Sequence, residues 1–216
     1  MASASRTRMT LDVRRAHMLD AGIELFARRS WEEVSIEEIA AACGVSRGLL
    51  YHYFRGKRDY YIASVEHAVE RLHVAYTDPD LPATTQLRVG LERFFATIAE
   101  QPETYAALRR VAPADEEAAA ILERDRQEFA QRVLSGMPKP GSGSPLARAT
   151  ARAWIGSVEA CGLYWLRNPD VPSEQLVAIL SEALIASMLA ASRYDSSIEL
   201  PASVQAALRP TLLGDL

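Results

Sequence analysis

The fold of the N-terminal part of this chain is decided by the stretch Ser35-Ile-Glu-Glu-Ile-Ala-Ala-Ala-Cys-Gly-Val-Ser-Arg-Gly-Leu-Leu-Tyr-His-Tyr-Phe54. It opens with a capping box, because the Ser35 hydroxyl and the Glu38 carboxylate are spaced to satisfy free N–H groups at a helix start. Gly44 permits the left-handed turn that ends a helix, and Ser46 is placed to cap a second short helix. The stretch therefore predicts a helix-turn-helix.

The two short helices are expected to pack through four apolar side chains, Ile39, Ala40, Val45 and Leu50. This packing leaves the outer face of the second helix exposed, and the major groove of B-DNA is wide enough to admit one α-helix. Tyr53 and Phe54 follow at helical spacing on the inner side, so we expect them to be core residues.

The rest of the chain is also predicted to be helical, because apolar residues recur at helical spacing and no run of alternating β-branched residues is found. The predicted helices span 11–29, 35–43, 46–53, 57–75, 83–100, 102–112, 115–135, 146–167 and 173–193. The breaks at 77–82, 136–145 and 168–172 contain the prolines and glycines typical of loops. We therefore predict an all-α chain, with a three-helix helix-turn-helix domain at 1–56, a helical bundle at 57–216, and helix 57–75 connecting the two.

The charge of the chain is unevenly distributed. Residues 1–58 carry ten Lys/Arg and seven Asp/Glu, whereas residues 59–216 carry fourteen and twenty-one. A basic module on an acidic body suits binding of duplex DNA by the N-terminal domain. Arg6 and Arg8 could form either an unstructured tail or an arm that enters the minor groove.

Composition argues against several other classes of protein. The sequence lacks an apolar run of membrane-spanning length and a hydrophobic stretch behind its basic N-terminus, so we expect a soluble, cytoplasmic protein without membrane contact. Cys43 and Cys161 are too few for a zinc site or a disulfide framework. A Gly-rich phosphate loop and a Gly-x-Ser-x-Gly motif are also missing, so we predict no catalytic site, metal or cofactor.

The last two long helices indicate a homodimer. Residues 175–192 contain one charged residue, Glu182, and a helix that is apolar nearly all round must be covered on two sides. The expected interface consists of Ala149, Ala153, Gly156, Ala160, Ile185 and Leu189. A thick monomeric core is the alternative.

The N-terminal motif resembles that of the TetR/AcrR family of bacterial transcriptional regulators. The family pattern is present as Ile39-Ala40, Gly44-Val45-Ser46, Tyr51-His52-Tyr53-Phe54 and Lys57. The resemblance covers residues 12–74, and its order, spacing and helix caps agree together. Ser30 departs from the pattern, since the family commonly has glycine there.

The resemblance implies DNA contacts from Ser35, Ser46, Arg47, Gly48, Leu49, Tyr51, His52 and Lys57. Arg47 is the candidate for reading a guanine edge, because a guanidinium pairs bidentately with O6 and N7. The hydroxyls at the helix starts and Lys57 would contact phosphates. Leu49, apolar where many relatives are small or polar, could touch a thymine methyl or cover the groove floor, and His52 is either a phosphate contact or a solvated residue.

The resemblance also implies a small-molecule pocket in the helical bundle. Its expected lining is Phe94, Phe95, Tyr105, Leu108, Phe129, Trp154 and Tyr164, although each aromatic could instead be core filler. An apolar lining suits a hydrophobic or amphipathic effector. The predicted function is thus a dimeric repressor that such an effector releases from a palindromic operator. The alternatives are an activator, an effector-independent regulator, a helical small-molecule-binding protein and an enzyme.

Overall fold

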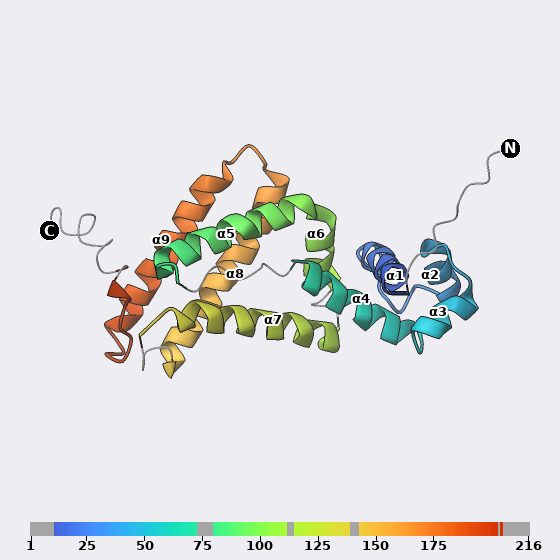
Figure 1. Cartoon of the computed structure of the whole chain (residues 1–216), viewed down its shortest axis with the longest axis horizontal. Helices are drawn as coiled ribbons and strands as arrows, with labels where there is room; N and C mark the ends of the chain where they lie inside the picture. Colours follow the sequence, from blue (N-terminus) through green and yellow to red (C-terminus); the bar gives the residue numbers. More distant parts are fainter. Residues whose placement is uncertain (1–10, 73–79, 112–114, 139–142, 203, 205–216) are drawn as a thin grey trace. The chain divides into compact units, whose positions relative to one another are not determined.

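The computed structural model of the chain describes residues 11–72, 80–111, 115–138, 143–202 and 204. Across these residues the secondary structure is helical, without a strand (Figure 1), which confirms the predicted all-α fold. The helices are α1 (Leu11–Phe26), α2 (Ile36–Ala42), α3 (Arg47–Tyr53), α4 (Lys57–Leu72), α5 (Ala83–Glu100), α6 (Pro102–Val111), α7 (Glu116–Ser135), α8 (Pro145–Arg167) and α9 (Ser173–Ser192). Arg6 and Arg8 lie outside the described residues.

The chain divides into two compact units. The first unit holds α1–α4 together with residues 103–122, which include α6 after its first residue and the first turns of α7. The second unit holds α5, the rest of α7, α8 and α9. The two units do not coincide with the domains predicted at 1–56 and 57–216, because α4 packs with α1 in the first unit. The predicted domains are defined by function, and they stay a prediction.

In the first unit, α1 and α4 approach closely at Gly22. A Cβ added to Gly22 would lie 2.3 Å from the Ser64 Oγ and 2.7 Å from the Tyr60 hydroxyl oxygen. That hydroxyl donates a hydrogen bond to the Met18 carbonyl oxygen at 2.6 Å, so a polar contact also joins the two helices inside the core. The closely packed α1–α4 pair therefore supports the two short helices, α2 and α3.

The capping box and the turn lie where the sequence predicted them. The Ser35 Oγ accepts a hydrogen bond from the Glu38 amide at 3.2 Å, and the Ser35 amide donates to the Glu38 carboxylate at 2.7 Å. Gly44 has a φ of +64°, the left-handed conformation that glycine adopts without strain. Ile39 and Leu50 are buried on the inner sides of α2 and α3. The predicted helix-turn-helix geometry is therefore confirmed.

In the second unit, α8 and α9 are consecutive antiparallel helices joined by a short turn (Figure 1). The Trp154 indole Nε1–H of α8 donates to the Leu180 carbonyl oxygen of α9 at 2.8 Å. Arg126 of α7 donates from Nε and Nη2 to the two Glu159 carboxylate oxygens of α8, each at 2.9 Å. These side-chain bonds fix the register of α8 against both neighbours.

The expectation that no stretch reaches membrane-spanning length is not met, because among the described helices α9 is long and apolar enough to cross a membrane. Its buried residues recur every three or four positions, at Val177, Leu180, Leu184, Met188 and Ala191. This spacing places one face of α9 in the core of the second unit, as in a helix of a folded bundle. The opposite face of α9 is exposed.

Candidate nucleic-acid interface and ligand cavity

The outer face of α3 carries exposed side chains, as a helix that enters a DNA groove requires. Arg47 and His52 are exposed, and Tyr51 has 53% of its surface accessible. Leu50, on the opposite face, is 1% exposed. A Cβ added to Gly48 would meet its nearest neighbour only at 4.0 Å, so the backbone of this turn lies open. The packing of α3 thus leaves one polar face available to a partner.

The two serines of the predicted interface begin the two short helices. The Ser35 Oγ takes part in the capping box, and the Ser46 Oγ accepts a hydrogen bond from the Leu49 amide at 3.2 Å. Both serines are exposed, while the Leu49 side chain is half-buried and packs against the core of the unit. The serine hydroxyls therefore hold the helix starts in place, and their contacts to phosphate stay predictions.

Arg47 forms an ion pair with Glu37, a residue of the first turn of α2. The Arg47 Nη1 donates to the Glu37 Oε1, and the two side chains are 63% and 57% exposed. This bond and a hydrogen bond to its own backbone lower the pKa of the Glu37 carboxyl below its usual value of 4.5. The guanidinium expected to read a base is therefore held across the helix-turn-helix by an ionised carboxylate.

Lys57 contributes to a cluster around Trp31, between α1 and the start of α4. The Lys57 Nζ donates to the Glu32 carbonyl oxygen at 2.8 Å and lies 5.3 Å from the centre of the Trp31 ring. The Arg58 guanidinium lies 4.9 Å from the same ring, and Tyr61 stacks on it at 5.7 Å. Cations over an indole stabilise such a cluster. Lys57 thus stabilises the segment between α1 and α2. Its contact with a DNA phosphate stays a prediction.

Arg58 joins α4 to the start of α7 within the first unit. Its Nη1 donates to the Asp115 Oδ2 at 2.7 Å, and its Nη2 donates to the Glu117 Oε2 at 2.9 Å. Asp115 also accepts hydrogen bonds from the Glu117 and Ala118 amides, so it caps α7. The hydrogen bond from Arg58 holds the pKa of the Asp115 carboxyl below its usual value. The ion pair ties the start of α7 to the helix that follows the helix-turn-helix.

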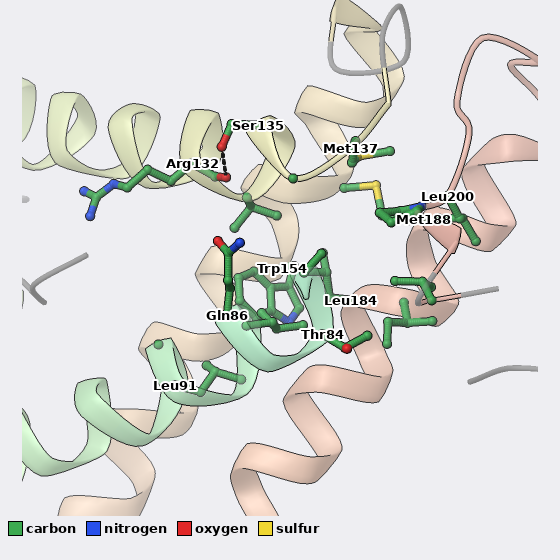
Figure 2. Close-up of a pocket in the computed structure, with 18 of the residues that line it drawn as sticks. Thr84, Gln86, Leu91, Arg132, Ser135, Met137, Trp154, Leu184, Met188 and Leu200 are labelled. Atoms are coloured by element: carbon green, nitrogen blue, oxygen red, sulfur yellow. Dashed lines mark hydrogen bonds between the residues drawn. The ribbon is translucent and has the colours of Figure 1, made fainter. Parts of the chain in front are cut away.

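The second unit contains a cavity of about 270 Å³ among α5, α7, α8, α9 and the residues Leu200, Pro201 and Val204 (Figure 2). Its lining is mainly apolar and includes Leu87, Leu91, Phe129, Met137, Trp154 and Met188. The Phe129 and Trp154 rings are stacked, with centroids 6.3 Å apart and planes 11° from parallel. Because the Trp154 N–H is bonded to Leu180, this residue offers an aromatic face rather than a donor. Cavities of this composition suit hydrophobic small molecules.

Arg132 is the charged residue among those lining the cavity. Its side chain extends away from Trp154 in Figure 2, and its Nε donates to the Glu128 carbonyl oxygen at 3.3 Å. Its guanidinium also lies 5.3 Å from the centre of the Phe129 ring. Besides hydrocarbon, aromatic and thioether groups, the lining thus includes the polar side chains of Thr84, Gln86 and Ser135 (Figure 2).

Comparison with known proteins identifies the family. Residues 18–63 match the family described as "Bacterial regulatory proteins, tetR family", and residues 83–187 match "Tetracyclin repressor-like, C-terminal domain". A crystal structure of a tetR-family transcriptional regulator from Streptomyces coelicolor is 31% identical, with 93% of this chain and 90% of that chain covered and a TM-score of 0.72. The chain belongs to the TetR family. It is a helix-turn-helix regulator of transcription.

One further relative and one solved structure show how far the likeness to this TetR-family regulator extends. The HTH-type transcriptional activator FasR of Mycolicibacterium smegmatis is 33% identical over 102 residues, which are 45% of this chain and 46% of that protein. The transcriptional regulator FadR of Bacillus subtilis, solved in complex with stearoyl-CoA, is 20% identical. The match covers 79% of this chain and 97% of FadR with a TM-score of 0.59, so it shows a shared fold.

The effector residues expected from the sequence lie in different places in the TetR-family regulator. Phe129 and Trp154 line the cavity. Phe94 and Phe95 pack against each other in α5, and Phe95 is buried against Trp165. Tyr105 and Leu108 are buried in the first unit, and Tyr164 is 60% exposed. Sequence spacing suggests which aromatics face inward, and Tyr164 does not; which hollow an inward-facing aromatic lines depends on how the helices cross.

The residues expected at a dimer interface lie on α8 and α9, and three of them are exposed. Ala149, Ala153 and Ala160 of α8 are exposed, whereas Gly156, Ile185 and Leu189 are half-buried, and Ile185 also lines the cavity. On the same two helices, the large apolar side chains of Tyr164 and Ile179 are 60% and 61% exposed. The exposed residues supply small and apolar surface suited to close packing of helices.

The remaining sequence candidates are structural. Cys43 is buried, burial raises the pKa of its thiol, and its Sγ contacts the Tyr60 hydroxyl at 3.2 Å. Among the described residues, no group of three or more His, Cys, Asp or Glu side chains could hold a metal ion.

Two functional candidates were not predicted from the sequence, Glu37 and Arg58. Their partners stand ten and fifty-seven positions away in the chain, so helix periodicity carries no sign of them.

Proposed function

We propose that this TetR-family regulator is a dimeric repressor, which leaves a palindromic operator when a small apolar or amphipathic molecule occupies the cavity of the second unit. The observation that carries the proposal is the pairing of an exposed recognition helix, α3, with an apolar cavity elsewhere in the same chain. Cytoplasmic location and the absence of enzymatic activity follow from this role.

The DNA-binding part of the proposal rests on the exposed face of α3. Arg47 would read a guanine edge, Tyr51 and His52 would contact bases or phosphates, and Lys57 would neutralise a phosphate. One such helix covers few base pairs, so specific binding calls for two copies on half-sites roughly 34–36 Å apart. The exposed small residues of α8, Ala149, Ala153 and Ala160, support assembly of those two copies, because small side chains permit close helix packing.

The effector part rests on the composition of the cavity. Its stacked Phe129 and Trp154 rings and its two methionines form an apolar surface that adapts to the shape of a ligand. FadR of Bacillus subtilis, which has the same fold, was solved with stearoyl-CoA, and this supports an apolar or amphipathic ligand class here as well.

The proposal is tested first by selecting bound sequences from a random duplex library with the purified chain. A palindromic consensus is expected, with affinity that falls steeply as salt rises. The selected operator is then placed over a reporter promoter in bacterial cells, where the chain should lower transcription. A selection without a consensus would contradict the DNA-binding role.

A cavity-filling variant tests the effector role. Leu184 lines the cavity and is 6% exposed, so Leu184→Trp should fill it from α9 without touching α3. Neutral apolar compounds that raise the melting temperature of the wild type should release it from the operator. The Leu184→Trp protein should bind the operator normally and ignore these compounds. Release of both proteins by the same compounds would place the effector elsewhere.

The second candidate function is transcriptional activation. The relative FasR is named an activator, and the same fold and interface would serve either role. The reporter assay separates the two, since an activator raises transcription from a promoter beside its operator.

A further inference from the structure

The ion pair between Glu37 and Arg47 spans the two helices of the DNA-reading motif. Glu37 occupies the first turn of α2, and Arg47 is the first residue of α3. Both side chains are more than half exposed, so neither is needed to fill the core. Neighbouring Glu38 instead bonds Arg29 and the Ser35 amide. Two adjacent carboxylates on one helix thus have different partners.

The bond to Glu37 leaves Arg47 able to read a base. A guanidinium carries five N–H donors, and the pair uses a donor on Nη1. Nε and Nη2 form a second donor edge, which can meet guanine O6 and N7 bidentately. Glu37 can therefore keep its bond while Arg47 binds guanine. Fixing the long arginine side chain in advance also reduces the conformational entropy lost on binding.

The same bond disfavours the use of Arg47 on other DNA. An unrestrained arginine binds any nearby phosphate, which strengthens binding without regard to sequence. The bond to Glu37 fixes the direction in which the Nε/Nη2 edge points. To bind a phosphate that this edge does not reach, Arg47 must break its bond to Glu37. The released carboxylate then faces the negatively charged duplex without a cation. The pair thus penalises phosphate contacts relative to a base contact.

We propose that Glu37 is a specificity-determining residue of this regulator, which positions Arg47 for one guanine and withholds it from the phosphates of other sequences. This inference rests on the proposed role of Arg47 in reading DNA. Glu37 acts through Arg47, so it is a positioning residue rather than a contact. Removing its charge should strengthen binding to random DNA while weakening discrimination at one base pair.

The test compares four purified full-length proteins: wild type, Glu37→Gln, Arg47→Ala and the double variant. The probes are an operator selected by the wild type from a random duplex library, the same operator with each base pair replaced in turn, and a scrambled duplex. Glu37→Gln should lower the operator-to-scrambled affinity ratio about fivefold or more, the low end of what one bidentate base contact contributes. The loss should be confined to one G·C pair, and the double variant should behave as Arg47→Ala.

Salt dependence gives a second measurement, which a merely structural role of Glu37 would not move. On the scrambled duplex, Glu37→Gln should steepen the slope of log affinity against log salt by about 0.9, because one more phosphate is contacted. The double variant should lose this increase. Glu38→Gln is the matched control, since it removes the neighbouring charge, and glutamine can still close the capping box. It should leave the base preference at the Arg47 position unchanged.

Three outcomes would overturn the inference. Glu37→Gln could keep the wild-type base preference, lose it equally at all positions, or change affinity to the same extent when Arg47 is alanine. If Arg47→Ala removes the preference at one base pair while Glu37→Gln does not, the proposed function stands and the positioning role fails. If the wild type itself shows no operator preference, the proposed function fails with it.

Discussion

Replacing Gly22 by alanine should destabilise the first unit, although alanine is the better helix former. The added Cβ would lie 2.3 Å from the Ser64 Oγ and 2.7 and 2.8 Å from the Tyr60 hydroxyl oxygen and Cζ. Carbon contacts are comfortable only at about 3.5–4.0 Å. Ser64 and Tyr60 are 0% exposed, so neither can swing out into solvent.

The surrounding hydrogen bonds resist the adjustment. The Ser64 Oγ donates to the Tyr60 carbonyl oxygen at 2.8 Å, and the Tyr60 hydroxyl donates to the Met18 carbonyl oxygen at 2.6 Å. Overpacking a core typically costs about 1–3 kcal/mol. A hydrogen bond lost during the adjustment adds about 1 kcal/mol. The better helix propensity of alanine returns about 0.5–1 kcal/mol. The net loss of unfolding free energy should be about 1–3 kcal/mol.

Thermal unfolding followed by far-ultraviolet circular dichroism measures this loss. At 2–4 °C per kcal/mol for a chain of this size, the melting temperature should fall by about 2–12 °C. Gly90→Ala is the matched control: Gly90 lies inside α5 and has nothing within 4 Å of the added Cβ, so this variant should be slightly more stable than wild type. If Gly22→Ala melts at or above the wild-type temperature, the close approach of α1 and α4 does not limit packing, and the reasoning is refuted.

Three further changes have defined outcomes. Ala153→Arg places a charge in the proposed seam of α8 and should convert a sedimenting dimer to monomer at micromolar concentration. The pKa of Glu38 is lowered to about 2, mainly by its hydrogen bond from the Ser35 amide and by Arg29. Its charge therefore stabilises the fold above about pH 4.5, and this contribution is lost as the pH falls toward 2. Across this pH range the melting temperature of Glu38→Gln should fall less steeply than that of the wild type. Arg126→Ala leaves the part-buried Glu159 carboxylate without its bidentate partner and should lower the unfolding free energy by about 1–3 kcal/mol, measured by urea titration.

Two of these changes have a matched control. Ala99→Arg puts the same charge on an exposed position of α5 and should leave the sedimentation coefficient unchanged. For Arg126, lysine keeps the charge but not the two-bond geometry, so Arg126→Lys should recover part of the loss. The first expectation is contradicted if the wild type sediments as a monomer. The second is contradicted if the melting temperatures of Glu38→Gln and wild type fall in parallel with pH, and the third if Arg126→Ala is as stable as wild type.

The boundaries of the two short helices and the helix-turn-helix motif followed from local chemistry, whereas α1 ends at Phe26, before the predicted Arg29. Ser35, Glu38, Gly44 and Ser46 act within a few residues of their own positions, so the capping box, the turn and the two short helices were predictable from spacing alone. The same holds for the inward faces of α2 and α3, because helical periodicity determines which side of a single helix is apolar.

The tertiary structure decided which residues pair with Arg47 and Arg58, how closely α1 and α4 approach at Gly22, and what shape the cavity has. Each depends on how one helix crosses another, and neither residue spacing nor composition specifies that crossing. Phe129 and Tyr105 illustrate the difference, since both are apolar-face aromatics, yet one lines the cavity and the other is buried in the first unit. Local interactions act along the chain and can be read from it, whereas these contacts join residues that only packing brings together.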